Sequence, residues 1–583
     1  MTFDPIYDFT FSIGTQTGLG NVNTSDQLNG EYLATQGTMT VSAGTDTGTY
    51  PLYPTTTSGV NLSPKNFFQY DNLITPNQNP TIFDVHGLLF RNASSGLELN
   101  LYSNGASSYT FYDSNSFNVT GTTFTFSEAP GGGQTYPAKY VFDVTAAPSC
   151  ANDYVTIGIP ANTASAGQAN IVGFNNIYSN PSGTGFCPTT TPSVKFAYAS
   201  GSGQVPADIS ISQNGTRLAY IENLPTGSSY FHVLTLGTTG SNGTSPTAAV
   251  VPGTGNNAVD QRILLSPDGG TTKQSSTTAP FVVFTTGDTN DVAYVTTYSR
   301  SGTGSGYVYK LTNIFNGSAP TIVWSAAVTA VPSGPVYESV SNKVFFTDSS
   351  GRIDYITDNS TTPTVTYSGV LASGTTSENP VVIDGTSGMV YATFNSNGTN
   401  AIVIQTPTSL KSPVTVPIGT ASTTYAGPYS PDFNNAFYTG VGTPRMYIAG
   451  TGTGTLPTLY SVGFTGTRLN ASDITSTALA TGTADSSPVT EFYNSALAKD
   501  FLFVGVTNHC IATTGGGTAG CVMSLDITSG SPTVNASTTA LAASGGTTGI
   551  VVDNNSSSSQ ASSIYYGTKT GGTLVKATQS GLN

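Results

Sequence analysis

A short segment that begins with proline and continues as an apolar, β-rich run recurs through the last two thirds of the chain. Its copies begin at Pro206, Pro280, Pro335, Pro380, Pro428 and Pro488. The spacings are 74, 55, 45, 48 and 60 residues, and a seventh copy without proline starts near Gly549 (GIVVD). Proline suits the first position of a strand, because that position needs no N–H for the hydrogen-bond ladder of the sheet.

Each opening leads into a second apolar run, as Pro335 leads into residues 343–347 (KVFFT). Turn residues at 348–351 (DSSG) and an alternating run at 352–356 follow, so one repeat holds three or four short strands. A repeat of roughly 40 to 50 residues with four strands has the period of a β-propeller blade, whose faces are buried only when neighbouring blades stack on it. The repeats therefore predict an all-β fold with a seven-bladed propeller.

The last repeat, residues 549–578, supplies three apolar runs and is one strand short. A ring closes best when an N-terminal strand completes the C-terminal blade, because this covers an unpaired edge. Val194 to Tyr198 (VKFAY) is the candidate for that strand. If these residues instead form a blade of their own with the hairpin at 154–174, the propeller has eight blades.

Residues 1–146 lack the repeat and show alternating runs of about five residues between Gly, Asn and Ser turns, such as 97–101 (LELNL) and 109–112 (YTFY). This pattern predicts an antiparallel β-sandwich. Residues 147–192 then form a connector with a hairpin, and residues 193–583 form the propeller.

Composition restricts the class of protein. Charged residues are 8% of the 583 residues, against about 25% in ordinary globular proteins. Only 17 Lys and Arg stand against a net charge of −14, which leaves no basic face for nucleic acid. No run approaches the roughly 20 apolar residues that span a membrane. Polarity that rests on Ser, Thr, Asn and Gly is typical of secreted and cell-surface proteins.

The N-terminus, MTFDPIYDFTFSIG, shows no basic segment followed by a long apolar core. We therefore expect a mature chain from which an export signal has been removed. The four cysteines fit two disulfides: Cys510 with Cys521 across a Gly/Thr-rich hairpin, and Cys150 with Cys187 around the connector. Free thiols or a metal site are the alternative, but no CxxC occurs. Disulfides imply an oxidising compartment.

Two resemblances extend this interpretation. Residues 67–90 (FFQYDNLITPNQNPTIFDVHGLLF), with YDFTFS before them and GLELNLYSNGASSYTFYDS after them, resemble the N-terminal domain of bacterial secreted proteins of the PEP-CTERM type. The resemblance covers about a quarter of the chain and implies export to a surface or matrix, with no catalytic residues to transfer. Such proteins usually end in a Pro-Glu-Pro motif, an apolar helix and a basic tail, whereas this sequence ends SGLN, so no sorting through such a tail is expected.

The repeats, such as 379–394 (NPVVIDGTSGMVYATF), resemble quinoprotein-like and YVTN-type propellers. Quinoprotein repeats carry a tryptophan docking motif, and Trp324 is the single tryptophan of this chain. No pyrroloquinoline quinone, and no other cofactor, is therefore expected.

Several polar groups are candidates for a metal or glycan site. Asp71, Asn72, Asp84 and His86 lie within the first motif, where the alternative is turn capping by Asp71 and Asn72 and backbone contacts of His86. Calcium is the metal that the oxygen-rich loops Asp288-Thr289-Asn290-Asp291 and Asp553-Asn554-Asn555 would bind, although neither has EF-hand spacing, so we expect turns.

Catalytic candidates are few. His232 lies in an alternating strand and His509 beside a predicted disulfide, so both are expected to be structural. Carboxylates near the strand openings are limited to Glu338, Glu378, Asp384 and Glu491. The sequence thus favours a secreted, non-catalytic protein acting in adhesion, glycan contact or self-assembly into extracellular filaments, with partners that are copies of itself, glycans or surface proteins. The alternative is a propeller enzyme, a hydrolase or lyase, acting on an extracellular polysaccharide.

Overall fold

The computed structural model describes two compact units, residues 1–130 with 160–164 (unit 1) and residues 131–159 with 165–583 (unit 2). It describes the chain except residues 1–5, 14–15, 27–31, 56–58, 75–84, 93, 104–108, 115–118, 122, 129–135, 141–146, 160–166, 181, 184, 225, 271–272, 300–304, 359–361, 373–378, 397–399, 422–426, 513–518, 531, 533–538, 544, 555–557, 570–573 and 579–583. Its regular structure is nearly all β: the described residues include one α-helix, α1 (Asn435–Thr439), and two 3₁₀ turns, η1 (Thr286–Asp288) and η2 (Thr453–Thr455). None of the described helices is long and apolar enough to cross a membrane.

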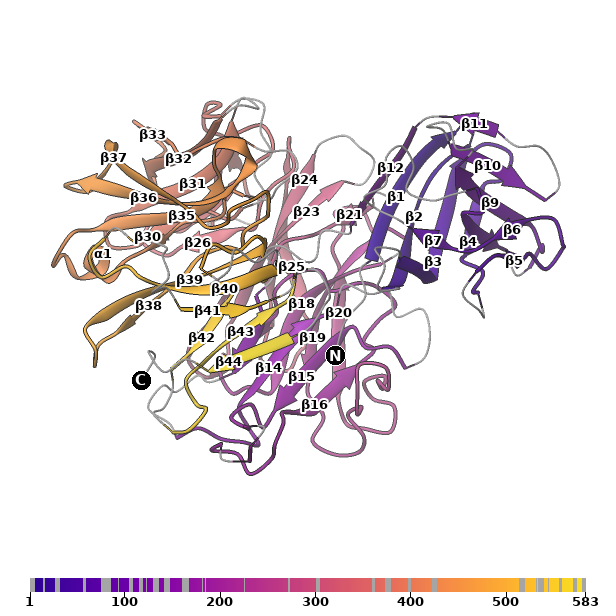
Figure 1. Cartoon of the computed structure of the whole chain (residues 1–583), viewed down its shortest axis with the longest axis horizontal. Helices are drawn as coiled ribbons and strands as arrows, with labels where there is room; N and C mark the ends of the chain where they lie inside the picture. The colour runs from indigo at the N-terminus through magenta and orange to yellow at the C-terminus, as the bar shows by residue number, and fades with distance from the viewer. Residues whose placement is uncertain are drawn as a thin grey trace. The chain divides into compact units, whose positions relative to one another are not determined.

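Unit 1 consists of two main antiparallel sheets and one small hairpin (Figure 1). The larger sheet runs in the order β12 (Thr123–Glu128), β1 (Ile6–Ile13), β2 (Gln16–Asp26), β3 (Tyr32–Ala43) and β4 (Gly48–Pro51), and β7 (Leu73–Ile74) also pairs with β3. The smaller sheet runs in the order β11 (Val119–Gly121), β10 (Tyr109–Asp113), β9 (Glu98–Ser103) and β8 (Leu88–Arg91). The hairpin pairs β5 (Asn61–Leu62) with β6 (Gln69–Tyr70).

The two sheets of unit 1 bury one common hydrophobic core. Phe11 and Met39 of the larger sheet share it with Leu99 and Phe111 of the smaller sheet. The rings of Phe11 and Phe111 stack with centroids 5.6 Å apart. This shared core explains the alternating pattern of the sequence, because each strand turns every second side chain toward the other sheet.

Unit 2 consists of eight successive antiparallel sheets (Figure 1). The first four contain β13 (Ala138–Tyr140), β14 (Tyr154–Gly158), β15 (Ile171–Asn175) and β16 (Ser193–Tyr198); β17 (Ser210–Ile211), β18 (Arg217–Asn223), β19 (Ser229–Thr235) and β20 (Val259–Leu264); β21 (Gln274–Ser275), β22 (Phe281–Val283), β23 (Val292–Ser299), β24 (Gly306–Thr312) and β25 (Thr321–Val328); β26 (Val336–Glu338), β27 (Lys343–Thr347), β28 (Ile353–Thr357) and β29 (Val365–Thr366).

The last four contain β30 (Val382–Asp384), β31 (Met389–Ser396), β32 (Asn400–Pro407) and β33 (Val414–Pro417); β34 (Asp432–Phe433), β35 (Arg445–Thr451), β36 (Pro457–Thr465) and β37 (Arg468–Ala478); β38 (Thr490–Asn494), β39 (Lys499–Asn508), β40 (Ala519–Asp526) and β41 (Thr539–Ala542); β42 (Val551–Asp553), β43 (Ser563–Gly567) and β44 (Leu574–Thr578).

The repeat read from the sequence corresponds to these sheets. Pro280 and Pro335 directly precede β22 and β26, and each of the other four prolines lies within a few residues of the first strand of its sheet. The second apolar run of each repeat is the next strand, as 343–347 is β27. The prolines therefore mark positions just ahead of a strand, where a missing N–H breaks no ladder bond.

The expected seam of the ring was wrong. β16, which contains Val194 to Tyr198, pairs with β15 in the first sheet and not with the last sheet. The hairpin at 154–174 and residues 194–198 thus form a sheet of their own, as the alternative interpretation had it. The first strand of that sheet is β13, which directly follows Pro137 and lies among residues 1–146, where the sequence pattern predicted the sandwich. Residues 147–159 and 165–192 of the predicted connector consequently belong to unit 2, whose first segment begins at residue 131.

The first and eighth sheets of unit 2 pack against each other. Tyr178 and Cys187 share an apolar cluster with Ala561 and Tyr565. The N–H of Phe186 donates to the carbonyl of Ser559 over 2.9 Å. Side-chain packing and these polar contacts, rather than a shared strand, join the two ends of the series.

Both predicted disulfides are confirmed. Cys150 pairs with Cys187, with Cα atoms 5.6 Å apart, and Cys510 pairs with Cys521, with Cα atoms 5.8 Å apart. The first bridge lies beside the contact between the first and eighth sheets, because both of its cysteines belong to or pack on the same apolar cluster. The second joins β40 to the residues just after β39, as the hairpin between two runs required.

Candidate functional site

Glu491, one of the four sequence candidates, lies in a group of three carboxylates from the sixth and seventh sheets. Its backbone N–H donates to Asp432 Oδ2 on β34 over 2.8 Å. On the neighbouring strand β39, Asp500 stands opposite Tyr493, two residues along β38 from Glu491. Because side chains two apart share a face of a strand, Glu491 and Asp500 lie on the same face of the seventh sheet.

The three carboxyls cannot all carry a charge at neutral pH. Burial, and next the adjacent Asp500 carboxyl, raise the pKa of Glu491 to about 9. Burial also raises the pKa of Asp432, although the N–H groups of Glu491 and Phe433 counteract it. Glu491 is therefore a neutral carboxylic acid at pH 7, able to donate its proton, while Asp500 accepts the N–H of Asn435 at 2.8 Å.

Tyr136 lies where the first strands of several sheets meet. Its N–H donates to Asp208 Oδ1 of the second sheet over 2.6 Å, and its hydroxyl interacts with Thr490 of the seventh sheet. Its ring packs on Gly549, where an added Cβ would lie 2.5 Å from ring carbons. Burial raises the pKa of Asp208 to about 7, opposed by that hydrogen bond. Tyr136 thus connects segments from the first, second, seventh and eighth sheets.

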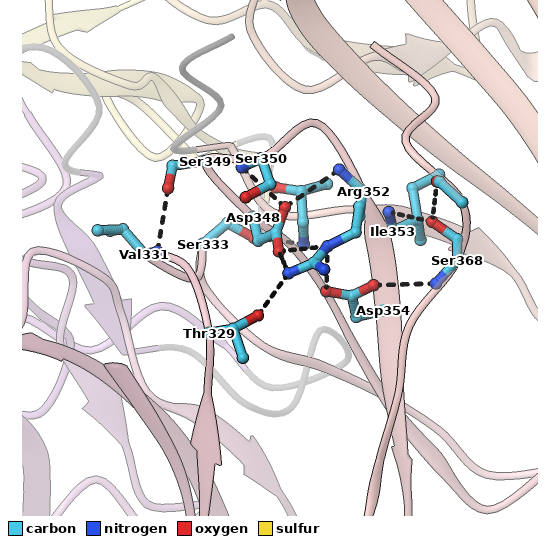
Figure 2. A network of polar contacts seen from close by, with 12 residues as sticks. Thr329, Val331, Ser333, Asp348, Ser349, Ser350, Arg352, Ile353, Asp354 and Ser368 are labelled. Atoms are coloured by element: carbon cyan, nitrogen blue, oxygen red, sulfur yellow. Dashed lines mark hydrogen bonds and ion pairs between the residues drawn. The ribbon is translucent and has the colours of Figure 1, made fainter. Parts of the chain in front are cut away.

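A second carboxylate pair is built around Arg352 at the turn between β27 and β28 (Figure 2). Arg352 Nε donates to Asp348 Oδ2 over 2.8 Å and lies 3.7 Å from Asp354 Oδ2. Asp348 Oδ1 also accepts the N–H groups of Ser350 and Arg352, and Asp354 Oδ1 accepts the N–H of Ser368. Both carboxylates are fully buried.

One arginine cannot neutralise two buried carboxylates. Burial, and next the charge of Asp348, raise the pKa of Asp354 to about 8. The network connects residues on both sides of the turn, from Thr329, which accepts from Arg352 Nη2 over 2.9 Å, to Ser368 (Figure 2). It therefore ties together the turn, the preceding segment and the segment after β29.

His232 has no ring nitrogen available for proton transfer to a substrate. Its Nδ1 lies 3.0 Å from Asp260 Oδ1, and its Nε2 lies 3.0 Å from Glu222 Oε2. The ring is fully buried and stacks on Tyr220 at 4.9 Å. Burial disfavours its charge, but Asp260 and Glu222 outweigh burial and raise its pKa. This agrees with the structural role expected for it.

Two of the candidate residues in the motif of unit 1, Asp71 and Asn72, form hydrogen bonds with backbone groups. Asp71 Oδ1 accepts the N–H of Leu73 over 3.0 Å, and Asn72 bridges the carbonyl of Tyr53 and the N–H of Leu89. His86 Nδ1 lies 3.8 Å from Asp71 Oδ2. Asp84 lies outside the described residues. The turn-capping interpretation of Asp71 is therefore confirmed.

Of the two oxygen-rich loops, the first begins at the end of the 3₁₀ turn η1, as the turn interpretation expected, and Asp553 of the second is the last residue of β42. Asp288 Oδ1 accepts the N–H of Gln213, and Asp291 Oδ1 accepts both the N–H and the hydroxyl of Thr285. Asp553 pairs with Lys139 at 2.9 Å, and Asn555 lies outside the described residues. Within the described part of the chain, no group of three or more His, Cys, Asp and Glu side chains is arranged to hold a metal ion.

The remaining candidates lie apart from one another. Glu338 accepts the N–H groups of Val340 and Ser341 at 2.7 Å each, and Asp384 accepts the N–H of Thr386. His509 packs its ring near Gly482, and Trp324 donates to Asp358 Oδ1 over 3.1 Å. Glu378 is not among the described residues. Sequence reasoning found Glu491 but missed its partners Asp432 and Asp500, because only sheet pairing brings them to it.

No protein-family model and no curated protein sequence matches the chain. Solved structures that it resembles are WD40 and β-propeller-like proteins. Sqt1 of Saccharomyces cerevisiae is 11% identical over 70% of this chain and 90% of its own, with a TM-score of 0.40. The periplasmic gluconolactonase of Pseudomonas aeruginosa is 11% identical over 64% and 93%, with a TM-score of 0.32.

The WD40 domain of SCAP from fission yeast is 8% identical over 64% of this chain and 85% of its own, with a TM-score of 0.34. The three named structures thus include both a gluconolactonase and a WD40 domain. Likenesses at this level carry no argument about activity. The PEP-CTERM and quinoprotein-like resemblances remain predictions.

Proposed function

We propose that the chain is an exported, non-catalytic binding protein that acts by contact with extracellular glycans, surface proteins or copies of itself. In this proposal unit 2 is an eight-bladed propeller, one blade for each sheet, and unit 1 is an antiparallel sandwich. Two disulfides support an oxidising compartment. The resemblance of residues 67–90 to PEP-CTERM-type proteins adds export to a surface or matrix.

One observation supports the non-catalytic proposal: three largely buried ionisable side chains of unit 2, His232, Arg352 and Lys139, are each engaged with neighbouring carboxylates. His232 uses both nitrogens on carboxylates. Arg352 is shared by Asp348 and Asp354, and Lys139 contacts Asp553 and Tyr178. A general base must reach the proton that it abstracts from a substrate, whereas these groups are occupied in joining strands and sheets.

The second candidate function is hydrolysis or lysis of an extracellular polysaccharide. The observation that favours it is the neutral carboxyl of Glu491 beside the carboxyl of Asp500, since a proton-bearing carboxyl with a second carboxyl near it is the arrangement that acid catalysis uses. Glu491 is the side chain on which this alternative depends.

One purified sample distinguishes the two. Full-length protein is incubated with acidic and neutral polysaccharides, and retention on the polymer and release of reducing or unsaturated ends are measured together. Our proposal expects retention without turnover, and the same retention for Glu491→Gln. Turnover that disappears in Glu491→Gln establishes the enzyme. Absence of retention on polymers and cell surfaces, together with strictly monomeric behaviour in sedimentation, disproves the proposed function.

A further inference from the structure

Unit 1 gathers its two basic side chains in one place. Residues 1–130 contain only Lys65 and Arg91 against ten Asp and Glu. Both reach the same spot beside Gly96: a Cβ built on Gly96 would lie 3.7 Å from Arg91 Nη2 and 4.0 Å from Lys65 Cε. Gly96 has φ of 66°, so a side chain at this position would strain the backbone, although it would meet Arg91 and Lys65 only at ordinary contact distances.

The carboxylate of Glu98 contacts both residues, Lys65 through its backbone and Arg91 through its side chain. The N–H of Lys65 donates to Glu98 Oε1 over 3.0 Å, and Arg91 Nε lies 3.7 Å from that oxygen. Glu98 is fully buried, so it anchors the two residues from beneath. Lys65 Nζ donates to Ser114 Oγ over 3.2 Å and has no carboxylate partner among the residues that the structure describes. One carboxylate facing two cations leaves a net positive charge at this spot.

An exposed aromatic ring, that of Phe67, packs on Tyr112, which stands two residues before Ser114, the partner of Lys65 Nζ. Phe67 is 55% exposed, although it lies only two residues from Lys65. Its ring is held against Phe68 at 5.6 Å and Tyr112 at 6.3 Å. Ser63 Oγ accepts the N–H groups of both Phe67 and Phe68, which fixes the turn between β5 and β6. Phe67 is therefore held by contacts of its ring and its backbone while more than half of its surface stays exposed.

Two cations held by Glu98 and an exposed phenylalanine ring together suit one class of ligand. A sugar ring places its C–H face on an aromatic ring, and its carboxylate pairs with Arg and Lys. A neutral sugar would leave the cations unused, and a purely apolar partner would leave them desolvated without a counter-charge.

We propose that Phe67, Lys65 and Arg91 form a binding site for an acidic sugar residue of an extracellular polysaccharide. The site rests on the proposed function, of which it names the ligand class. Phe67 provides the stacking surface for the sugar ring. Lys65 and Arg91 provide positive charge for the sugar carboxylate, although the net charge of the whole chain is −14.

The test uses full-length protein and polygalacturonate, with dextran as the neutral polymer of comparable size. Affinity electrophoresis at low salt measures retention of the wild type, Phe67→Ala and Lys65→Gln. We expect about tenfold weaker retention for Phe67→Ala, the loss that about 1.4 kcal/mol of stacking produces. We expect about fivefold weaker retention for Lys65→Gln at low salt, and little difference from wild type near 1 M NaCl, where charges are screened within about 3 Å.

Matched controls are Phe284→Ala and Lys411→Gln, an exposed phenylalanine and an exposed lysine of unit 2. Melting curves check that all four variants fold. If the wild type binds polygalacturonate and both unit 1 variants bind like the controls, the site is wrong while the proposed function stands. If dextran retains the wild type as strongly as polygalacturonate does, and Lys65→Gln does not change this retention, the proposal that the ligand is acidic is wrong. If the wild type binds neither polymer, this inference fails, and the cell-surface and sedimentation measurements decide the proposed function separately.

Discussion

Lys139 Nζ lies 2.9 Å from Asp553 Oδ2, and this ion pair joins the first strand of the first sheet of unit 2 to the first strand of the eighth. Both side chains are almost completely buried. The same ammonium lies 3.4 Å from the hydroxyl of Tyr178, which itself donates to Asp153. Residues more than four hundred positions apart in the chain thus form one buried polar network.

Breaking this pair should strongly destabilise unit 2. Lys139→Met leaves Asp553 buried without its cation, and we expect a loss of about 3–5 kcal/mol in the free energy of unfolding. The double variant Lys139→Met/Asp553→Leu should lose less free energy of unfolding than Lys139→Met alone, because it removes the buried carboxylate together with its cation. Denaturant unfolding of the three proteins measures this. Lys499→Met, which removes an exposed ion pair with Asp526, should change the free energy of unfolding by less than about 1 kcal/mol. An equal effect of Lys139→Met and Lys499→Met would contradict the stabilising role of the buried Lys139–Asp553 pair.

The two disulfides should differ in how much they stabilise the folded protein. Cys150 and Cys187 close a loop of sequence separation 37, and Cys510 and Cys521 one of 11. By lowering the entropy of the unfolded chain, the first bridge should stabilise the folded state by about 4 kcal/mol and the second by about 3 kcal/mol. We expect Cys150→Ser/Cys187→Ser to lower the melting temperature more than Cys510→Ser/Cys521→Ser, because the first bridge also packs at the contact between the first and eighth sheets. Mass spectrometry after alkylation without reductant checks the bonding: any alkylated cysteine in the native protein counts against it.

Glu491 should make stability fall as pH rises. Its pKa is raised from 4.5 to about 9, so between these values the folded protein holds a proton that the unfolded chain releases. Its favourable contribution is complete below about pH 4.5 and is lost as pH approaches 9. Glu491→Gln should match the wild type near pH 5 and exceed its stability at pH 9, by on the order of 1–3 kcal/mol after allowance for its partial exposure.

Glu338→Gln is the control of opposite sign. Burial opposes the charge of Glu338, but hydrogen bonds from Ser341 and Val340 outweigh it and lower its pKa. Its contribution is present above the unfolded pKa and is lost as the pH falls, so this variant should be less stable than the wild type at neutral pH. A stability difference between Glu491→Gln and the wild type that does not change with pH would refute the interpretation that Glu491 is protonated at neutral pH.

His232 should prove structural. His232→Phe preserves ring packing on Tyr220 but leaves Glu222 and Asp260 without the imidazolium, and we expect a loss of about 3–5 kcal/mol. Because the folded pKa of His232 is raised, its contribution is complete below pH 6.5 and declines as pH rises through the folded pKa. The loss measured by denaturation should therefore be larger at pH 6 than at pH 9. Glycan retention measured on the folded variant should be unchanged.

Local rules were sufficient for much of this protein. Proline before an apolar run marked an early strand in six of the eight sheets described in unit 2, because the reason, a missing N–H, acts within a few residues. The hairpin around Cys510 and Cys521 and the turn cap of Asp71 were readable for the same reason, since spacing of a few residues fixes which groups can meet.

Tertiary structure alone decided the rest. Only the pairing of β13 with β14 and of β15 with β16 shows that these strands form the first sheet and that β16 does not complete the last one. Glu491 could be noticed in the sequence, but its pKa depends on Asp500 and Asp432, which strand pairing and sheet stacking bring beside it. Lys65 and Arg91 are visible as the two cations of the first 130 residues, yet their meeting beside Gly96 follows from the packing of the β5–β6 turn on β8 and β9. Charge interactions fall off with distance in space, not along the chain, and the sequence by itself does not contain those distances.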